Sequence, residues 1–371
     1  EQVFPLEGLH YPVLAGLAAV ELSIADYSAL QLFQNAARQV RPDIAFITSD
    51  VPALARICQL VDGMPLGLVL AAGWLATCTP TEIAAEIETS LDFLSSSWGD
   101  LPERQSSLRA TLDHSWQLLT GEERQAFQKL SVFQSVFNRQ AAEQVAGVSV
   151  RGLRSLVDKS MLQASQGSYR MHDLLRQYAA EKLTADEPAA SQVRQAHCAY
   201  YLERLAEREG RLKSAQRSQT LSEMDAEIND LQTAWKQACT QADISRLGRS
   251  LEGLCLYYEM RLRFREGEGA CQAALSHLPI RSDQPGKEHV LRARLLLWQA
   301  SFLGSSGRLE AAISLHREAG EMLDRLEQQG LDVRRPRAMY WQAEGDIQAE
   351  LKHKHACNQR GIALYQELGD T

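Results

Sequence analysis

The most constraining feature of this sequence is a change of hydrophobic spacing within residues 167–183, which read GSYRMHDLLRQYAAEKL. Tyr169 and Met171 alternate with polar neighbours, which is the spacing of a strand. From Asp173 onward the apolar residues recur every three or four positions, which is the spacing of a helix. The sequence therefore predicts a strand that passes directly into a helix, with His172 at the corner between them.

Asp173 is the expected cap of this helix, because its carboxylate can accept hydrogen bonds from the unpaired amides of the first turn. His172 would then point its imidazole away from the core strand. An imidazole at such a corner can donate a hydrogen bond to a phosphate. The alternative is a histidine that only caps or packs at a helix start, and the three residues taken alone favour this alternative.

A second corner is predicted at residues 62–68, where two apolar helical segments meet. Gly63 can adopt the left-handed conformation that ends the first helix. Pro65 would fix φ at the start of the next helix, expected over residues 66–76. Such a rigid corner is a suitable platform for a flat ring, although a plain helix-turn-helix corner would have the same pattern.

Residues 26–104 are predicted to form a small helical domain around this corner. Helices are expected over residues 25–40, 50–60 and 81–94, the second of them capped by Asp50. Upstream, residues 3–9 read as a short strand or extended segment. We expect residues 1–25 to be the tail of an upstream domain, because the chain opens in mid-pattern and without Met.

Residues 105–184 have a different pattern, that of helices followed by a hairpin. Thr120 and Glu123 form a capping box at the start of one helix, and Asn138 is the expected cap of the next. Two strands, expected over residues 161–163 and 169–172, follow the helices. This order predicts a winged-helix domain.

Residues 185–371 are predicted to be helical throughout, with degenerate repeats of paired helices. Three segments can be superposed so that Tyr258, Ala300 and Gly345 correspond, at spacings of 42 and 45 residues. This period exceeds the about 34 residues of a tetratricopeptide repeat because the helices are longer. We expect a tetratricopeptide-like (TPR-like) superhelical arm, with a tight turn at Gly307.

Two details of the arm can be predicted from residue types. Ala311 and Ala312 would provide a small face after the turn at Gly307. The aromatic residues Trp298, Tyr340 and Trp341 are expected to pack between helices rather than to form a ligand cage.

Residues 171–173, the segment CQLVDGMPLGLVLAAGWL around Pro65, and the segment LRATLDHSWQLLTGEERQAFQKLSVF resemble parts of the STAND-type ATPases, which include the NB-ARC proteins and the bacterial AfsR-like regulators. The resemblance covers nearly the whole chain and follows the family's domain order. It implies that the proline packs against adenine from the helical domain. It also implies that His172 contacts the ADP phosphate from the winged-helix domain and holds the inactive state.

The resemblance further implies that the chain is the regulatory and sensor region of a signalling switch. The chain would clamp ADP in the off state with an upstream nucleotide-binding domain in cis. The repeat arm would bind a protein or small-molecule inducer, and activation would allow homo-oligomers. The full-length parent would bind ADP or ATP with magnesium, whereas we expect no cofactor for this fragment alone.

We expect no enzymatic activity from this chain by itself, because it lacks the Gly-x-x-x-x-Gly-Lys-Ser/Thr loop that holds nucleotide phosphates. A nucleophile elbow of the type Gly-x-Ser-x-Gly is also missing. His353, His355 and Cys357 suggest a metal cluster, but His355 would point away from the other two on a helix, and no fourth ligand is near.

Charge and cysteine content limit the classes of partner and compartment. The net charge of −8 argues against nucleic acid or an anionic membrane as the main partner. The seven cysteines form no Cys-x-x-Cys pair, which is typical of reduced cysteines in a cytoplasmic protein. The sequence contains no apolar run of about 18 residues, which is the feature that would predict a membrane span.

A DNA-binding winged-helix regulator with a helical interaction scaffold is the alternative function. Residues 101–183 contain 11 Lys or Arg against 8 Asp or Glu. Arg151, Arg154 and Lys159 lie on the helix that would read DNA. This excess is weak and no basic run flanks it, so an intramolecular packing role is favoured.

Overall fold

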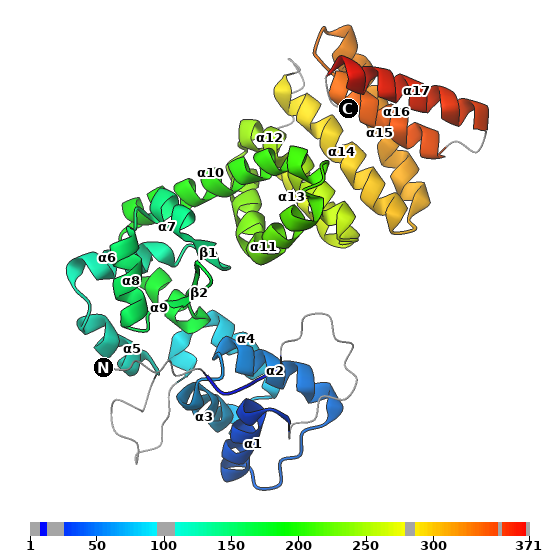
Figure 1. Cartoon of the computed structure of the whole chain (residues 1–371). Helices are drawn as coiled ribbons and strands as arrows, with labels where there is room; N and C mark the ends of the chain where they lie inside the picture. The colour runs from blue at the N-terminus through cyan, green and yellow to red at the C-terminus, as the bar shows by residue number, and fades with distance from the viewer. Residues whose placement is uncertain (1–7, 13–25, 95–107, 279–285, 348–350, 369–371) are drawn as a thin grey trace. The chain divides into compact units, whose positions relative to one another are not determined.

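The computed structural model describes residues 8–12, 26–94, 108–278, 286–347 and 351–368 of the chain (Figure 1). The fold is mainly α, as predicted, and divides into two compact units, residues 1–193 and 194–371. Of the strand expected at residues 3–9, residues 3–7 lie outside the described residues. The predicted domains 26–104 and 105–184 both fall within unit 1 and stay predictions as separate domains.

The first part of unit 1 is a group of short helices. They are α1 (Ser28–Val40), α2 (Val51–Leu60), α3 (Pro65–Gly73) and α4 (Pro80–Thr89), with single 3-10 turns at Thr48–Asp50, Trp74–Ala76 and Leu91–Phe93. α1 packs on α3, and α2 packs on α4. Buried Phe33, Leu54, Ile57, Leu68 and Ile83 form their common core. The predicted helices are present, with ends shifted by at most five residues.

The second part of unit 1 combines helices with a small sheet. The helices are α5 (Leu108–Gln117), α6 (Gly121–Leu130), α7 (Arg139–Ala146), α8 (Val150–Asp158) and α9 (Asp173–Thr184). The strands are β1 (Phe137–Asn138), β2 (Gln163–Ser165) and β3 (Ser168–Arg170), in the antiparallel order β1-β3-β2. Tyr169 lies opposite Phe137 on one side and Ala164 on the other. β1 was not expected from the sequence, because two residues give no periodicity.

The hairpin begins two residues later than predicted, for a local reason. The amide groups of Met161 and Leu162 donate to the carbonyl of Leu156, so these two residues belong to the turn that ends α8. Gln166 and Gly167 both have positive φ, of 48° and 82°, and make the tight turn between β2 and β3. The hairpin is therefore centred on this turn.

Two of the four predicted helix N-caps of unit 1 are confirmed, and the other two, Asp50 and Asp173, are wrong. Thr120 and Glu123 form a reciprocal capping box on α6. Asn138 accepts from the Ala141 amide at the start of α7. Asp50 stands at the start of α2 but does not cap it, because its carboxylate accepts from the Ile47 amide instead.

Unit 2 is a series of antiparallel helices. The series comprises α10 (Glu187–Leu212, in this unit from residue 194), α11 (Arg217–Thr240), α12 (Ile244–Met260), α13 (Phe264–His277), α14 (Lys287–Ser305), α15 (Leu309–Gln328), α16 (Arg334–Ile347) and α17 (Leu351–Glu367). The successive pairs are α12 with α13, α14 with α15, and α16 with α17. α14 also packs on α12 and on α16, which are the first helices of the neighbouring pairs. This is the arrangement of a TPR-like arm.

The predicted turn at Gly307 is confirmed by its φ of 80° between α14 and α15. Of the two alanines that follow, Ala312 is buried and Ala311 is exposed, so the predicted small face contains only Ala312. Tyr258 and Ala300 are both buried near the ends of α12 and α14. The side chain at the corresponding position 345 lies outside the described residues.

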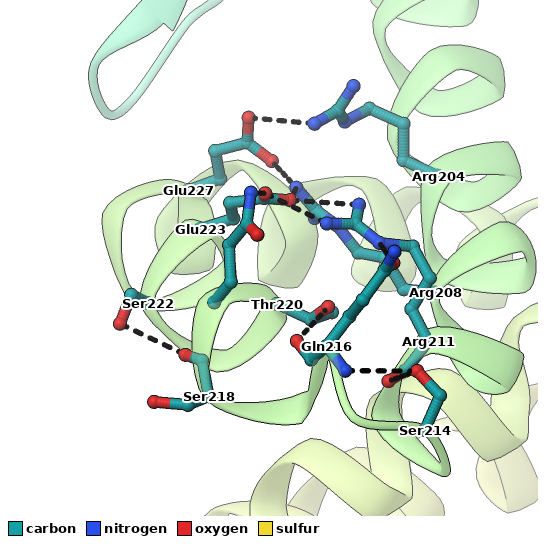
Figure 2. A network of polar contacts seen from close by, with 11 residues as sticks. Arg204, Arg208, Arg211, Ser214, Gln216, Ser218, Thr220, Ser222, Glu223 and Glu227 are labelled. Atoms are coloured by element: carbon teal, nitrogen blue, oxygen red, sulfur yellow. Dashed lines mark hydrogen bonds and ion pairs between the residues drawn. The ribbon is translucent and has the colours of Figure 1, made fainter.

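α10 and α11 are joined by a row of arginine–glutamate ion pairs, which Figure 2 shows from close by. Arg208 is 1% exposed and bonds Glu227 at 2.6 Å, and Arg204 reaches the same carboxylate at 3.4 Å. Arg211 bonds both oxygens of Glu223 at 2.9 and 3.0 Å. The buried guanidinium is therefore neutralised by carboxylates of the partner helix.

Candidate functional site

The corner between α2 and α3 has the backbone that the sequence predicts. Gly63 has a φ of 64°, and its amide donates to the Cys58 carbonyl at 2.9 Å, which ends α2. Asp62 also has a positive φ, of 48°. Pro65 is at the start of α3 and its side chain is exposed. The corner thus presents an apolar ring to solvent on a rigid backbone.

An extended segment of unit 1, residues 8–12, lies against this corner. The Leu9 amide donates to the Gly63 carbonyl at 2.9 Å. The Tyr11 hydroxyl donates to the Asp62 carboxylate, and burial, helped by this carboxylate, raises the pKa of Tyr11. A Cβ atom on Gly63 would overlap the Leu9 backbone. Glycine is therefore required at this position for both its conformation and its size.

His172 caps α9 at the strand-to-helix corner. Its Nδ1 accepts from the Leu174 amide at 3.0 Å. The expected cap, Asp173, is instead the first residue of the helix, and its carboxylate lies 3.4 Å from the Arg176 guanidinium. The prediction of Asp173 as the cap was wrong, because the imidazole one residue earlier already satisfies the first-turn amide.

The other ring nitrogen of His172 joins the two corners. Because Nδ1 accepts a hydrogen bond, Nε2 carries the proton and donates to the Val61 carbonyl at 3.1 Å. The Asp62 carboxylate lies 3.8 Å from the same nitrogen. His172 is 9% exposed, and burial lowers its pKa despite the nearby carboxylate. The imidazole is therefore neutral near pH 7.

The structure thus brings together the two elements that sequence reasoning singled out. His172 contacts Val61, the residue directly after α2, and the exposed Pro65 follows four residues later in the chain. However, both nitrogens of the imidazole are used by protein groups. A phosphate could accept from Nε2 only by replacing the Val61 carbonyl.

Three groups of this corner were missed from the sequence: Tyr11, Asp62 and the Val61 carbonyl. The sequence contains no signal for the carbonyl, because every residue has a backbone carbonyl whatever its side chain. Asp62 directly before Gly63 is visible in the sequence, but its contact with Tyr11 is long-range, across 51 residues.

The basic residues expected to read DNA lie on or next to α8. Lys159 is bonded to Glu123 at 2.6 Å and to the Leu118 carbonyl. Arg154 is 3.8 Å from Asp158, with both side chains largely exposed. Arg151 is exposed and has no ion pair with the described residues. Lys159, at least, has a structural role in attaching the end of α8 to α6.

The suggested cluster near the C-terminus is only partly described. His355 is exposed and hydrogen bonds Gln359 at 2.9 Å, and Cys357 is buried. The His353 side chain lies outside the described residues. In the described parts of the chain, no three His, Cys, Asp or Glu side chains lie close enough together to hold a metal ion. Within the same parts, no helix is both long and apolar enough to cross a bilayer.

Comparisons with known proteins give partial matches. No family model matches the chain. A Mycobacterium tuberculosis protein named as an HTH-type transcriptional regulator is 33% identical over 191 residues, which cover 48% of this chain and 21% of that protein. An uncharacterized protein of Mycobacterium bovis is 32% identical over 168 residues, 42% of this chain and 43% of that protein. The chain thus spans about a fifth to two fifths of these relatives.

Among solved structures, the chain is similar to a crystal structure from Pyrococcus horikoshii. That protein is described as a Signal Transduction ATPase with Numerous Domains that has a tetratricopeptide repeat sensor. The similarity covers 92% of this chain and 48% of the other, at 13% identity and a TM-score of 0.38.

Proposed function

We propose that this chain is the regulatory and sensor region of a STAND-type signalling ATPase, and that Pro65 and His172 help to retain ADP in its off state. The observation that carries the proposal is the hydrogen bond from His172 Nε2 to the Val61 carbonyl. It joins the strand-to-helix corner to the corner that presents Pro65. These are the two positions at which the sequence resembles the nucleotide contacts of the family.

The residues present fit one half of such a nucleotide site. The exposed Pro65 ring is a flat apolar surface against which an adenine would pack. His172 is positioned close by, but would have to exchange its carbonyl partner for a phosphate oxygen. The phosphate-binding loop and the magnesium ligands would come from an upstream domain in cis.

The Val61 bond suggests how the site would switch. With His172 on the carbonyl, the two corners are held together without nucleotide. With His172 on a phosphate, the same imidazole would link the nucleotide to α9. The repeat arm would bind the inducer, and its binding would shift the balance between these states. Exchange to ATP would then allow homo-oligomers.

The test is ADP retention by the full-length parent. We expect His172→Ala to release bound ADP about tenfold faster, because a hydrogen bond to a charged group contributes about 1.5–3 kcal/mol, and to raise basal activity. His277→Ala, which changes an exposed histidine of α13, is the control. Unchanged ADP release by the His172 variant would contradict the proposal.

A second candidate function is a DNA-binding regulator, and the name of the Mycobacterium tuberculosis relative, an HTH-type transcriptional regulator, favours it. Of the two exposed arginines on α8, Arg154 lies near Asp158, so Arg151 is the one we expect to contact phosphate. The test is a gel-shift titration of the whole chain at physiological salt. Duplex binding that falls with salt and that Arg151→Ala weakens would support this candidate. If the chain binds no duplex, the DNA-binding function is wrong and the ATPase sensor is the better proposal.

A further inference from the structure

A groove of about 800 Å³ opens on unit 2 and is lined mainly by α12, α14, α15 and α16. Its apolar lining comes from Leu256, Leu297, Trp298, Leu309, Ile313 and Met339. Leu309 is 63% exposed and Ile313 is 39% exposed, although both are large aliphatic residues. Trp298 stacks at 5.7 Å on Phe302 of the same helix, α14, and also forms part of the groove wall.

Most charged groups that line the groove are paired within the protein. Glu252 forms an ion pair with Arg294 of α14. Arg335 of α16 and Lys213, just beyond the end of α10, both bond Glu209. These contacts account for one carboxylate and two cations of the lining.

His316, the imidazole in the lining, is also partnered. Its Nε2 lies 3.1 Å from the Tyr340 carbonyl, and its Nδ1 lies 3.4 Å from Glu344. The ring stacks on Tyr340 at 4.2 Å. Burial lowers the pKa of His316, which keeps it neutral near pH 7. The histidine therefore adds no fixed positive charge to the groove.

Glu259 differs from all of these groups. It lines the groove from the last turn of α12, and its side chain is partly buried. No side chain in the described residues forms an ion pair or hydrogen bond with its carboxylate. Burial raises its pKa, with no cation nearby to oppose the effect. It is seven residues beyond Glu252, which places it about 10 Å further along the helix axis.

We propose that this groove binds a small amphipathic amine, with the ammonium group on Glu259 and the apolar part of the ligand against Leu256 and Trp298. Charge complementarity carries the choice of ligand. A half-buried carboxylate without a partner gains most from a cation that is itself partly removed from water. A neutral or anionic ligand would leave this carboxylate unpaired.

The size of the groove favours a small molecule over a peptide. Its volume lies within the range of about 300–1,000 Å³ that is usual for small-molecule sites. The ion pair of Glu209 with Arg335 joins α10 to the start of α16, and Arg335 is itself a lining residue.

This inference rests on the proposed sensor function for its regulatory meaning, because it identifies the chemical class of the inducer. The binding itself can be tested without any nucleotide measurement. If the amine binds while His172→Ala leaves ADP release unchanged, the groove is a ligand site and the proposed function is wrong. If ADP release changes while the amine does not bind, only this inference is wrong.

The experiment uses the whole chain and three probes of similar shape: 4-phenylbutylamine, 4-phenylbutanol and 4-phenylbutyrate. Binding is measured by isothermal titration calorimetry, with saturation-transfer NMR for weak binding up to millimolar concentrations. We expect the amine to bind at least tenfold more tightly than the alcohol, and the carboxylate to bind most weakly. Glu259→Gln should abolish the preference for the amine and leave the affinity for the alcohol unchanged.

Glu318→Gln is the matched control, because Glu318 is exposed on α15 and does not line the groove. This variant should bind all three probes with the same affinities as the unsubstituted chain. Circular dichroism melts of both variants check that the helices are intact. The proposal is overturned if the amine shows no binding or no preference over the alcohol. It is also overturned if folded Glu259→Gln keeps the preference.

Discussion

The corner around His172 and the groove around Glu259 each hold an ionisable side chain that is at least partly removed from water. At the corner, both imidazole nitrogens have backbone partners within unit 1. In the groove, the carboxylate has no partner among the described residues, although the other charged groups around it are paired. Burial favours the neutral form in both places, lowering the pKa of His172 and raising that of Glu259.

This difference distinguishes a side chain that stabilises the fold from one that is available to bind a ligand. A buried polar group that the protein satisfies contributes to stability, and its removal costs free energy. A group that the protein leaves unsatisfied costs stability, and a ligand can recover that cost. Substitutions at the two places should therefore change the free energy of unfolding in opposite directions.

The largest effect is expected at the corner backbone. Gly63→Ala should lower the stability of unit 1 by about 3 kcal/mol, since a left-handed non-glycine residue costs about 1–2 kcal/mol and a steric overlap adds about 1–3 kcal/mol. Gly147→Ala is the matched control, because Gly147 has nearly the same φ, 67°, with open space around its Cα. It should lose only about 1 kcal/mol.

Urea unfolding with hydrogen exchange read out on peptides of unit 1 measures both glycine variants. The difference between them isolates the contact of Gly63 with Leu9. Equal losses in the two variants would mean that residues 8–12 do not support the corner, and the contrast with the groove would then rest on His172 alone.

The next effect is expected at His172. His172→Ala should destabilise unit 1 by about 2 kcal/mol, the sum of a lost helix cap of about 1 kcal/mol and a lost buried hydrogen bond of about 1 kcal/mol. His172→Asn should recover about half, since asparagine is a strong cap but cannot reach Val61 in the same way.

Hydrogen exchange at the Leu174 amide distinguishes the two contributions of His172. It should be fast in the alanine variant and protected in the asparagine variant. If both variants were as stable as the unsubstituted chain, the imidazole would not stabilise the corner.

The pH dependence gives a smaller effect with a definite sign. The pKa of His172 is lower in the folded chain than the ordinary 6.5, so the unfolded chain binds more protons as the pH falls. Its stabilising contribution is complete above about pH 6.5 and is lost below it, by up to about 1 kcal/mol between pH 7.5 and 5.5.

The charged groups around the ring are Asp62, Asp173 and Arg170. Urea unfolding of unit 1 at the two pH values, for the parent chain and His172→Asn, measures the effect. The asparagine variant should be less sensitive to acid in unit 1. Equal sensitivity would assign the effect to another group.

The same comparison shows what the sequence could predict. The turn at Gly63, the position of Pro65 and the strand-to-helix corner at His172 follow from local spacing and residue type, and the structure has them. The Val61 carbonyl and the Tyr11–Asp62 contact could not be predicted, because they depend on packing between segments 51 or more residues apart. The cap at His172 was missed because capping preferences rank aspartate first, whereas ring geometry decides here.

For the groove, the sequence predicted its aromatic lining only as packing. Trp298 lines the groove and stacks on Phe302 of its own helix. Tyr340 is not among the lining residues and packs between helices, on His316 of α15. That Glu259 is unpaired could not be predicted, because most glutamates on amphipathic helices face water and a missing partner is not visible in a sequence. Which carboxylates the arm leaves unpaired is decided by the stacking of α12 on α14.

The smallest predicted effect is a gain in the free energy of unfolding on substitution of Glu259, opposite in sign to the losses expected at the corner. An acid whose pKa is raised in the folded chain contributes stability below its unfolded pKa, and this contribution is lost as the pH rises through the folded value. At pH 7 the Glu259 carboxylate therefore costs stability, and Glu259→Gln should make unit 2 more stable by about 0.5–1 kcal/mol. Glu318→Gln, on the exposed face of α15, should stay within about 0.5 kcal/mol of the parent chain.

Urea unfolding read out on unit 2 measures both glutamate variants at pH 7. A repeat at pH 4.5 should shrink the gain, because the raised pKa favours the neutral form of the carboxylate as the pH falls. A gain in stability together with lost preference for the amine would show that the carboxylate is kept for a ligand at a cost to the fold. A loss of stability in Glu259→Gln would mean that the protein itself uses this carboxylate. The groove would then be a satisfied site like the corner at His172, and the contrast between the two regions would disappear.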